Sequence, residues 1–159
     1  MKLTRDEVKT VSFYNDNARS WSDEHFELDY WKEEFENFKK FLPKGKILEI
    51  GCGGGRDAKV LISKGYDYIG TDIAKNFVNV ARKNNPKARF LVRSVYDLKF
   101  PEDFFDGLWC SATLLHIPKN KIKQALKEIK RVIKQDGVGF ISVKQGVGEE
   151  TNEKNRRDR

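Results

Sequence analysis

A glycine-rich segment directly after a short apolar run is the feature that most limits how this chain can fold. Residues 46–50 read as a buried strand, residues 51–55 hold four glycines, and a helical stretch begins at about Arg56. Glycines at such a junction adopt backbone angles closed to other residues, and they let a ligand lie against the main chain near the positive end of the helix. The segment therefore predicts a strand, a tight loop and a helix, with a ligand site at the loop.

The alternation of strand and helix recurs along the chain. Further strands are predicted at residues 67–71, 89–93, 105–111 and 138–143, and further helices at about 74–84 and 119–134. With right-handed crossovers, such units build a Rossmann-like, doubly wound α/β sheet of about five parallel strands in the order 3-2-1-4-5, with helices on both faces. Its ligand is expected beyond the carboxyl ends of the strands, where the glycine loop lies.

The N-terminal region reads differently from this core. Residues 26–42 place apolar side chains at three- and four-residue steps, which indicates one buried helix face that ends at Pro43 and Gly45. We therefore expect three parts: a helical lid or cap over residues 1–45, an α/β core over 46–146 that binds the ligand, and a flexible polar tail over 147–159.

The net charge is the feature of the composition that bears on possible binding partners. The chain has a formal net charge of +7, and the excess lies in residues 45–148, which carry 19 basic and 10 acidic groups. Most of these lysines fall on predicted solvated helix faces, so nucleic acid is a disfavoured partner, although a basic face toward an anionic substrate remains open.

Two cysteines, Cys52 and Cys110, are too few to indicate a metal site or a disulfide framework, and we expect no metal. Cys110 reads as a small buried hydrophobe. The first residues form no apolar signal region, and no apolar stretch approaches the ~20 residues needed to span a bilayer. We expect a cytoplasmic protein without a membrane partner.

Two acidic side chains near the glycine loop indicate which class of ligand it binds. Glu49 precedes the first glycine of the loop by two residues, and Asp72 ends the second strand 21 residues after Gly51. A carboxylate there can accept both ribose hydroxyls, although Asp also caps helices well and a helix follows. The dinucleotide pattern G-x-G-x-x-G/A would require Gly or Ala at position 56, where this chain has Arg, so a nicotinamide-dependent oxidoreductase is disfavoured.

Together these residues resemble the class I S-adenosylmethionine-dependent methyltransferases, over residues 13–146. The resemblance also includes Leu115-His116-Ile117-Pro118 after the fourth strand and the segment 129–137 before the fifth. It implies that S-adenosylmethionine is the cofactor, with S-adenosylhomocysteine as product. The implied cofactor-binding residues in the loop and after the second strand are Glu49, Gly51, Cys52, Gly53, Gly55, Asp72 and Ile73, where Asp72 holds the ribose and Ile73 packs on the adenine.

Two parts of the resemblance are looser. The family often places an acid for the adenine amino group after the third strand, where this chain has Ser94 and Val95, with Asp97 three residues beyond Ser94. Either Ser94 or Asp97 can serve. Residues 13–21 resemble a lid motif in which the first aromatic residue, here Tyr14, reaches the cofactor carboxylate; core packing explains Tyr14 equally well.

The implied reaction is methyl transfer by in-line displacement, which needs mainly positioning and a shielded site. His116, on the rim where substrates sit, is the candidate base for an alcohol or amine acceptor. The alternative is that His116 is only a hydrogen-bonded loop residue. The leading prediction is a small-molecule methyltransferase, because residues 111–114 lack the Asn- or Asp-Pro-Pro-Tyr clamp of adenine and glutamine methyltransferases. A non-catalytic or partner-dependent cofactor-binding subunit remains the alternative.

The family's sheet usually ends in an antiparallel hairpin, which the 15 residues after Lys144 are too few to supply. We therefore expect either a truncated chain or one completed by another chain. The fifth strand would lie at an exposed edge, which favours a homodimer or heteromer through that edge.

Overall fold

The computed structural model describes residues 3–146, and the predicted tail at 147–159 lies outside them. Its strands are β1 (Lys46–Ile50), β2 (Asp67–Asp72), β3 (Arg89–Val92), β4 (Phe105–Ser111) and β5 (Ile133–Ser142). Its helices are α1 (Arg5–Glu24), α2 (Lys32–Phe41), α3 (Arg56–Ser63), α4 (Lys75–Asn84), α5 (Lys119–Val132) and the short 3₁₀ turn η1 (Leu114–His116).

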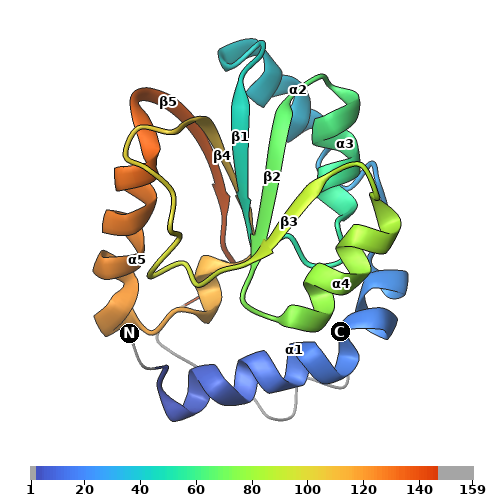
Figure 1. The fold of residues 1–159 in the computed structure, drawn as a ribbon, viewed down its shortest axis with the longest axis vertical. Coiled ribbons are helices and arrows are strands. Elements are labelled where there is room, and N and C mark those ends of the chain that lie inside the picture. The colour runs from blue at the N-terminus through green and yellow to red at the C-terminus, as the bar shows by residue number, and fades with distance from the viewer. Residues whose placement is uncertain (1–2, 147–159) are drawn as a thin grey trace.

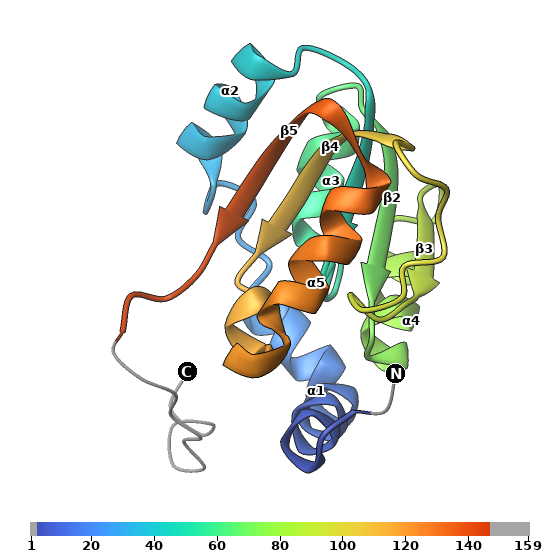
Figure 2. The ribbon, with the colours of Figure 1, turned by 90° about the vertical axis from the view of Figure 1, so that its left-hand side faces the viewer.

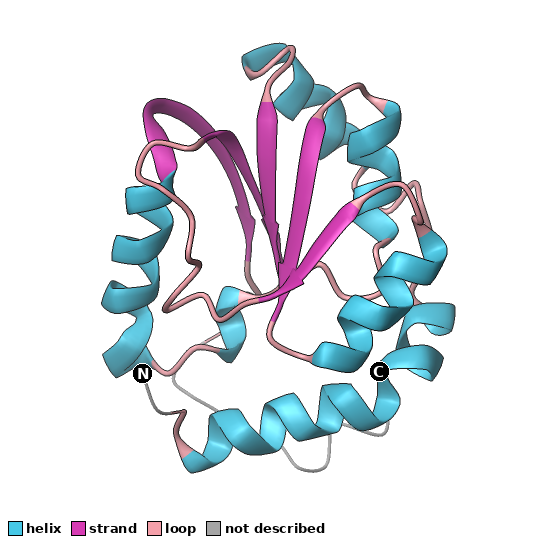
Figure 3. Ribbon diagram, in the orientation of Figure 1, coloured by secondary structure: helices cyan, strands magenta, loops and turns pink. Residues whose placement is uncertain are grey.

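The five strands form one parallel sheet in the order β3-β2-β1-β4-β5, as predicted (Figure 1). Helices lie on both faces, with α5 on one side and α2 and α3 on the other (Figures 2 and 3). In the described residues no antiparallel strand continues the sheet beyond β5. The fold is Rossmann-like, and its switch point lies between β1 and β4.

Alternation along β1 divides the core into two clusters. Leu48 and Ile50 point toward α5 and pack with Ile129 and Val132. Ile47 points to the opposite face, toward the cluster that α2, α3 and α4 cover. Because side chains alternate along a strand, Glu49 shares this second face with Ile47 and is directed into the protein rather than out of the sheet's edge.

Two N-terminal helices occupy different places. The helix predicted over 26–42 begins only at Lys32, because Trp31 is its N-cap and turns precede it. It packs flat on the sheet, where Phe35 stacks on Trp109 at 4.2 Å between ring centroids. In contrast, α1 crosses the carboxyl ends of the strands (Figure 1).

The start of α1 is fixed by a capping box that sequence reasoning missed. The Thr4 hydroxyl accepts a hydrogen bond from the Glu7 backbone N–H, and the Glu7 carboxylate accepts one from the Thr4 N–H. The pattern Thr-x-x-Glu is a recognised signal for a helix start, so α1 was readable in the sequence.

Candidate cofactor and acceptor site

The glycine loop is tied to the end of β2. The backbone N–H groups of Gly51 and Cys52 both donate to the Thr71 carbonyl, at 2.8 and 3.0 Å. Gly51 has φ +74°, and a Cβ there would lie 1.9 Å from Thr113 Oγ1, so only glycine fits between β1 and the turn after β4. The loop then closes on α3 through Gly55, whose φ is +82°.

Gly53 is the open point of this loop. Its N–H donates to Asp72 Oδ2 at 3.0 Å, and a Cβ built on it would meet nothing within 4 Å. Main chain is therefore exposed beside a carboxylate, which is the arrangement that a ribose with an adjoining polar chain requires. The residues present fit the cofactor that the sequence implies.

Asp72 lies at the carboxyl end of β2 and is half-buried. Its Oδ1 also accepts from the Ala74 N–H at 2.8 Å, just before α4 begins. Burial raises the pKa of this carboxyl to about 6, although hydrogen bonds from the backbone oppose the rise. The N-cap of α4 is Ala74, so Asp72 supports the turn before the helix and does not cap it. Each carboxylate oxygen keeps a second lone pair, so these bonds are compatible with the ribose role, which stays a prediction.

Glu49 lies under the loop and does not face its open side. The residue is 2% exposed, and its carboxylate accepts a hydrogen bond from the hydroxyl of Tyr68 on the neighbouring strand. Burial, and after it the nearby Asp57 carboxylate, raise the pKa of Glu49 well above its usual range. Contact of Glu49 with the cofactor stays a prediction, and the observed bond gives the residue a structural role.

The end of β3 lies beside Asp72, since the Arg93 N–H donates to the Asp72 carbonyl at 3.0 Å. Two of the predicted cofactor residues are buried, namely Val95 and Cys52, and Ile73 is half-buried. The Ser94 hydroxyl oxygen accepts a hydrogen bond from the Tyr96 N–H at 3.2 Å. Asp97 is exposed and lies 3.8 Å from Lys99. Ser94 directly follows Arg93, which bonds to Asp72, whereas Asp97 lies three residues further along. The adenine roles of Ser94 and Asp97 stay predictions.

The turn after β4 is fixed against the loop. Thr113 Oγ1 donates to the Ile50 carbonyl at 3.1 Å, and the His116 N–H donates to the Thr113 carbonyl at 3.0 Å. Residues three apart eclipse in a 3₁₀ turn, so His116 lies on the same side as Thr113. Cys110 before the turn is fully buried, as predicted.

Helix α1 contacts the segment after each of the first four strands, which sequence reasoning did not show. After β1, Ser22 packs on Gly54, and after β2 the Asn15 side chain accepts a hydrogen bond from the Asn76 N–H at 2.9 Å. After β3, the Glu7 carboxylate accepts a hydrogen bond from the Tyr96 hydroxyl. After β4, the Tyr14 hydroxyl lies 3.1 Å from His116 Nε2. Lys121 of α5 adds an ion pair with Glu7 at 2.7 Å. These partners hold the pKa of Glu7 down to about 2 against the effect of burial.

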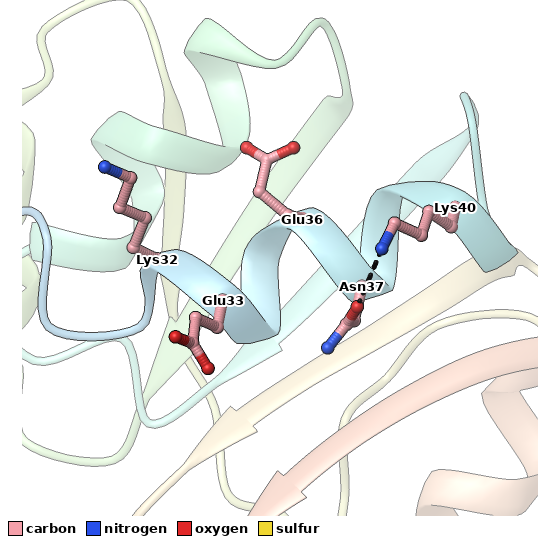
Figure 4. Close-up of a pocket in the computed structure, with 5 residues that line it drawn as sticks. All are labelled: Lys32, Glu33, Glu36, Asn37 and Lys40. Atoms are coloured by element: carbon pink, nitrogen blue, oxygen red, sulfur yellow. Dashed lines mark hydrogen bonds between the residues drawn. The ribbon is translucent and has the colours of Figure 1, made fainter.

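A separate hollow lies on the outer face of α2 (Figure 4). It is lined by side chains of that helix, namely Lys32, Glu33, Glu36, Asn37 and Lys40. None of the predicted site residues borders it. Among the described residues, no group of three or more His, Cys, Asp or Glu side chains could hold a metal ion, and none of the helices there has the length and apolar character of a membrane span.

Comparison with known proteins agrees with this fold and shows the family. A model of the methyltransferase domain family matches residues 48–141. An uncharacterized protein of Methanocaldococcus jannaschii is 34% identical over 149 residues, covering 92% of this chain and 68% of that protein. The chain therefore belongs to the methyltransferase domain family.

More particularly, it is a class I S-adenosylmethionine-dependent methyltransferase by family, and S-adenosylmethionine is the family's cofactor. The crystal structure of a SAM-dependent methyltransferase from Methanosarcina mazei superposes with a TM-score of 0.58 at 30% identity, over 64% of this chain and 52% of that one. A ubiquinone biosynthesis O-methyltransferase of Rickettsia typhi is 26% identical over 122 residues, which cover 74% of this chain. The alignments cover about half of the length of both proteins, 52% and 48%.

Substituting Gly53 with alanine separates folding from ligand binding. Its φ is +49°, so the new side chain should cost ~1 kcal/mol in unfolding free energy. Because the Cβ would enter the open space beside Asp72, the affinity for S-adenosylmethionine should fall at least ~10-fold. Urea unfolding and calorimetric titration measure the two effects; Gly65→Ala, with φ +88° and open space around its Cβ, is the matched control that should keep its affinity.

Proposed function

We propose that this chain transfers a methyl group from S-adenosylmethionine to a small-molecule acceptor. The observation that carries this proposal is the open main chain at Gly53 next to the Asp72 carboxylate, at 3.0 Å. When bound, the cofactor supplies a methyl group already activated on a sulfonium. The chain itself then has to bind, orient and shield the reacting groups.

The proposed binding residues have separate tasks. Gly51, Gly53 and Gly55, with Cys52 between them, present backbone to the methionine part of the cofactor. Asp72 accepts hydrogen bonds from the ribose, and Ile73 and Val95 flank the adenine, whose amino group takes Ser94 or Asp97 as its partner. Glu49 supports the loop from below through Tyr68.

Residues 1–45 are proposed to include a lid. Helix α1 spans the edge where the cofactor would lie, and its contacts at Asn76, Tyr96 and His116 support this role. Such a cover excludes water from the reaction and admits a small acceptor more readily than a polymer. Residues 46–146 would then form the cofactor-binding core.

A small-molecule acceptor is supported by this cover and by the Rickettsia relative, whose name describes an O-methyltransferase of ubiquinone biosynthesis. The test is release of S-adenosylhomocysteine on incubation with S-adenosylmethionine and separate panels of small hydroxyl, amine and thiol compounds, DNA, transfer RNA and protein. Turnover with a small compound alone is expected. Tight cofactor binding without turnover on any panel would favour the partner-dependent subunit instead.

The free edge of β5 is proposed as a protein interface. Within residues 3–146 the strand pairs only with β4, and Ile141 and Val143 near its end are 45% and 60% exposed. Light scattering at rising concentration should show a dimer that Ile141→Lys disrupts. A monomer at all concentrations would exclude self-association through this edge.

A further inference from the structure

The glycine loop is held on its α4 side by two neighbouring side chains. Asn84, the last residue of α4, donates from Nδ2 to the Gly54 carbonyl oxygen at 2.8 Å. Asn85, the next residue, donates from Nδ2 to the Gly55 carbonyl oxygen at 2.9 Å. Two successive carbonyl groups of the loop are therefore each bound by a side-chain amide that comes from 30 residues further along the chain.

The sequence Asn84-Asn85-Pro86 explains why both amides are found at this point. The residue before a proline is disfavoured in the helical region, and Asn85 is accordingly non-helical, with φ −137° and ψ 72°, as the C-cap of α4. Its Nδ2 also lies 3.4 Å from the Ala81 carbonyl oxygen. Because both partners of this nitrogen are carbonyl oxygens, it is the donor end of the amide that faces the loop.

The loop lies closely against Asn85. A Cβ on Gly55 would lie 2.5 Å from Asn85 Nδ2 and 3.2 Å from Ala81, so glycine is required there by the approach of α4. Asn85 is itself 8% exposed, whereas Asn84 is exposed. The two amides therefore make similar bonds in different surroundings, and the exposed one can be changed without opening a cavity.

The bond from Asn84 fixes the first of two peptide groups. In a trans peptide group, the carbonyl and the N–H of the next residue point in opposite directions. With the Gly54 carbonyl bound to Asn84, the Gly55 N–H points the other way and donates to the Cys52 carbonyl at 2.9 Å. This second bond closes the loop around Gly53, which lies between its two ends.

The Gly55 peptide group is oriented in the same manner. Its carbonyl faces Asn85, so the Arg56 N–H, the first of α3, points away from α4. The open position at Gly53 thus comes directly before two peptide groups whose directions are set by side chains of α4. Those directions determine the shape of the backbone that a ligand on the loop would contact.

We propose that Asn84 and Asn85 are positioning residues of the cofactor loop, which fix its backbone in the shape that receives the methionine part of S-adenosylmethionine. The role rests on the proposed methyltransferase function, in which the methionine part lies along the loop, and adds two residues to it. Neither asparagine touches the cofactor in this role. Each acts through the carbonyl that it holds.

The first test compares three ligands by calorimetric titration: S-adenosylmethionine, S-adenosylhomocysteine, and 5′-methylthioadenosine, which lacks the amino-acid part. Asn84→Ala should lower the affinity for the first two by ~3–10-fold, the effect of about one neutral hydrogen bond, and leave that for 5′-methylthioadenosine within ~2-fold. Asn84→Gln, which keeps a donor, should regain part of the loss. Asn79→Ala, at an exposed asparagine in the middle of α4, is the control and should bind all three ligands normally.

The second test examines the loop without a ligand. Amide hydrogen exchange at Gly55, whose N–H bonds to Cys52, should be faster in Asn84→Ala and unchanged in Asn79→Ala. The urea midpoint of Asn84→Ala should not move, because the side chain is exposed.

The buried asparagine should have the larger effect. Asn85→Ala removes the shorter hydrogen bond of the buried Gly55 carbonyl and leaves the 3.4 Å bond from the Lys59 N–H. Its affinity for the two ligands that carry the amino-acid part should fall by ~10–100-fold. Urea unfolding shows whether this variant folds, and Asn84→Ala decides the question if it does not.

Each outcome separates the positioning role from the proposed function. Unchanged affinities in Asn84→Ala, or equal losses for all three ligands, would overturn the positioning role and leave the methyltransferase proposal standing. The expected ligand pattern without turnover on any acceptor would support the positioning role and contradict the proposed function. No binding of S-adenosylmethionine to the unmodified protein would overturn both.

Discussion

Asp72→Asn is expected to lower the affinity for S-adenosylmethionine at least ~100-fold while making the free protein more stable at pH 7. The ribose hydroxyls would lose a charged acceptor, and hydrogen bonds to charged groups contribute ~1.5–3 kcal/mol each. The free protein gains because a half-buried carboxylate is replaced by a neutral amide. The amide oxygen can keep the hydrogen bond from the Ala74 N–H, whereas the bond from the Gly53 N–H is lost, which offsets part of the gain.

The pKa shift of Asp72 determines how the stability change depends on pH. The pKa of Asp72 is about 6 in the folded protein and 3.8 in the unfolded chain, so the folded state binds more protons between these values. The charge of Asp72 therefore destabilises the fold above pH ~6, and this cost disappears as pH falls toward 3.8. The gain from Asp72→Asn should reach at most ~3 kcal/mol above pH 6 and vanish near pH 4.

Calorimetric titration and urea unfolding at pH 7 and pH 5 measure both effects. In the unmodified protein, cofactor affinity should weaken as pH falls through ~6, because protonated Asp72 is a poorer acceptor. Asp67→Asn is the matched control, since Asp67 lies at the other end of β2 and pairs with Lys46 at the surface. Unchanged affinity in Asp72→Asn would remove Asp72 from the cofactor site.

Trp109→Ala is expected to lower the unfolding free energy by ~3–5 kcal/mol. Trp109 is fully buried in β4, and its ring stacks between Phe35 of α2 and Phe140 of β5, at 4.2 and 4.0 Å between centroids. Its indole Nε1 donates to Asp57 at 2.9 Å. Truncation would leave a cavity and also remove a partner from the buried Asp57 carboxylate.

Urea unfolding of Trp109→Ala measures this loss, with Phe41→Ala as the control. Phe41 is also an aromatic residue at the α2 side of the sheet, but it is 76% exposed, so its loss should change stability by less than ~0.5 kcal/mol. Similar small losses in both variants would show that α2 contributes little to the core.

The strand positions could be predicted because short apolar runs and glycine junctions are local signals, and the strand order followed from the right-handed crossovers between them. The strand β4 and the start of β1 were placed correctly at their residues, whereas β5 begins earlier than expected, at Ile133, with a register shift at Phe105 and Gly107 that no local pattern encodes. The capping box at Thr4 was a local signal for α1 that was overlooked.

The candidate site was predictable only in part. The glycines and Asp72 could be placed because the sequence itself indicates where the loop lies and where the second strand ends. The direction of Glu49 depends on the alternation along β1, and its bond to Tyr68 depends on the pairing of two strands. The contact between Tyr14 and His116 joins residues 102 positions apart, and it follows from how α1 docks rather than from any motif.

The central claim is that the glycine loop and Asp72 bind the cofactor, and amide NMR during titration with S-adenosylmethionine tests it most directly. We expect saturable shifts, with a dissociation constant on the order of micromolar, at Gly53, Ile73 and Val95, and no shifts around the α2 hollow at Lys32 and Glu36. Absent shifts, or shifts confined to α2, would contradict the account.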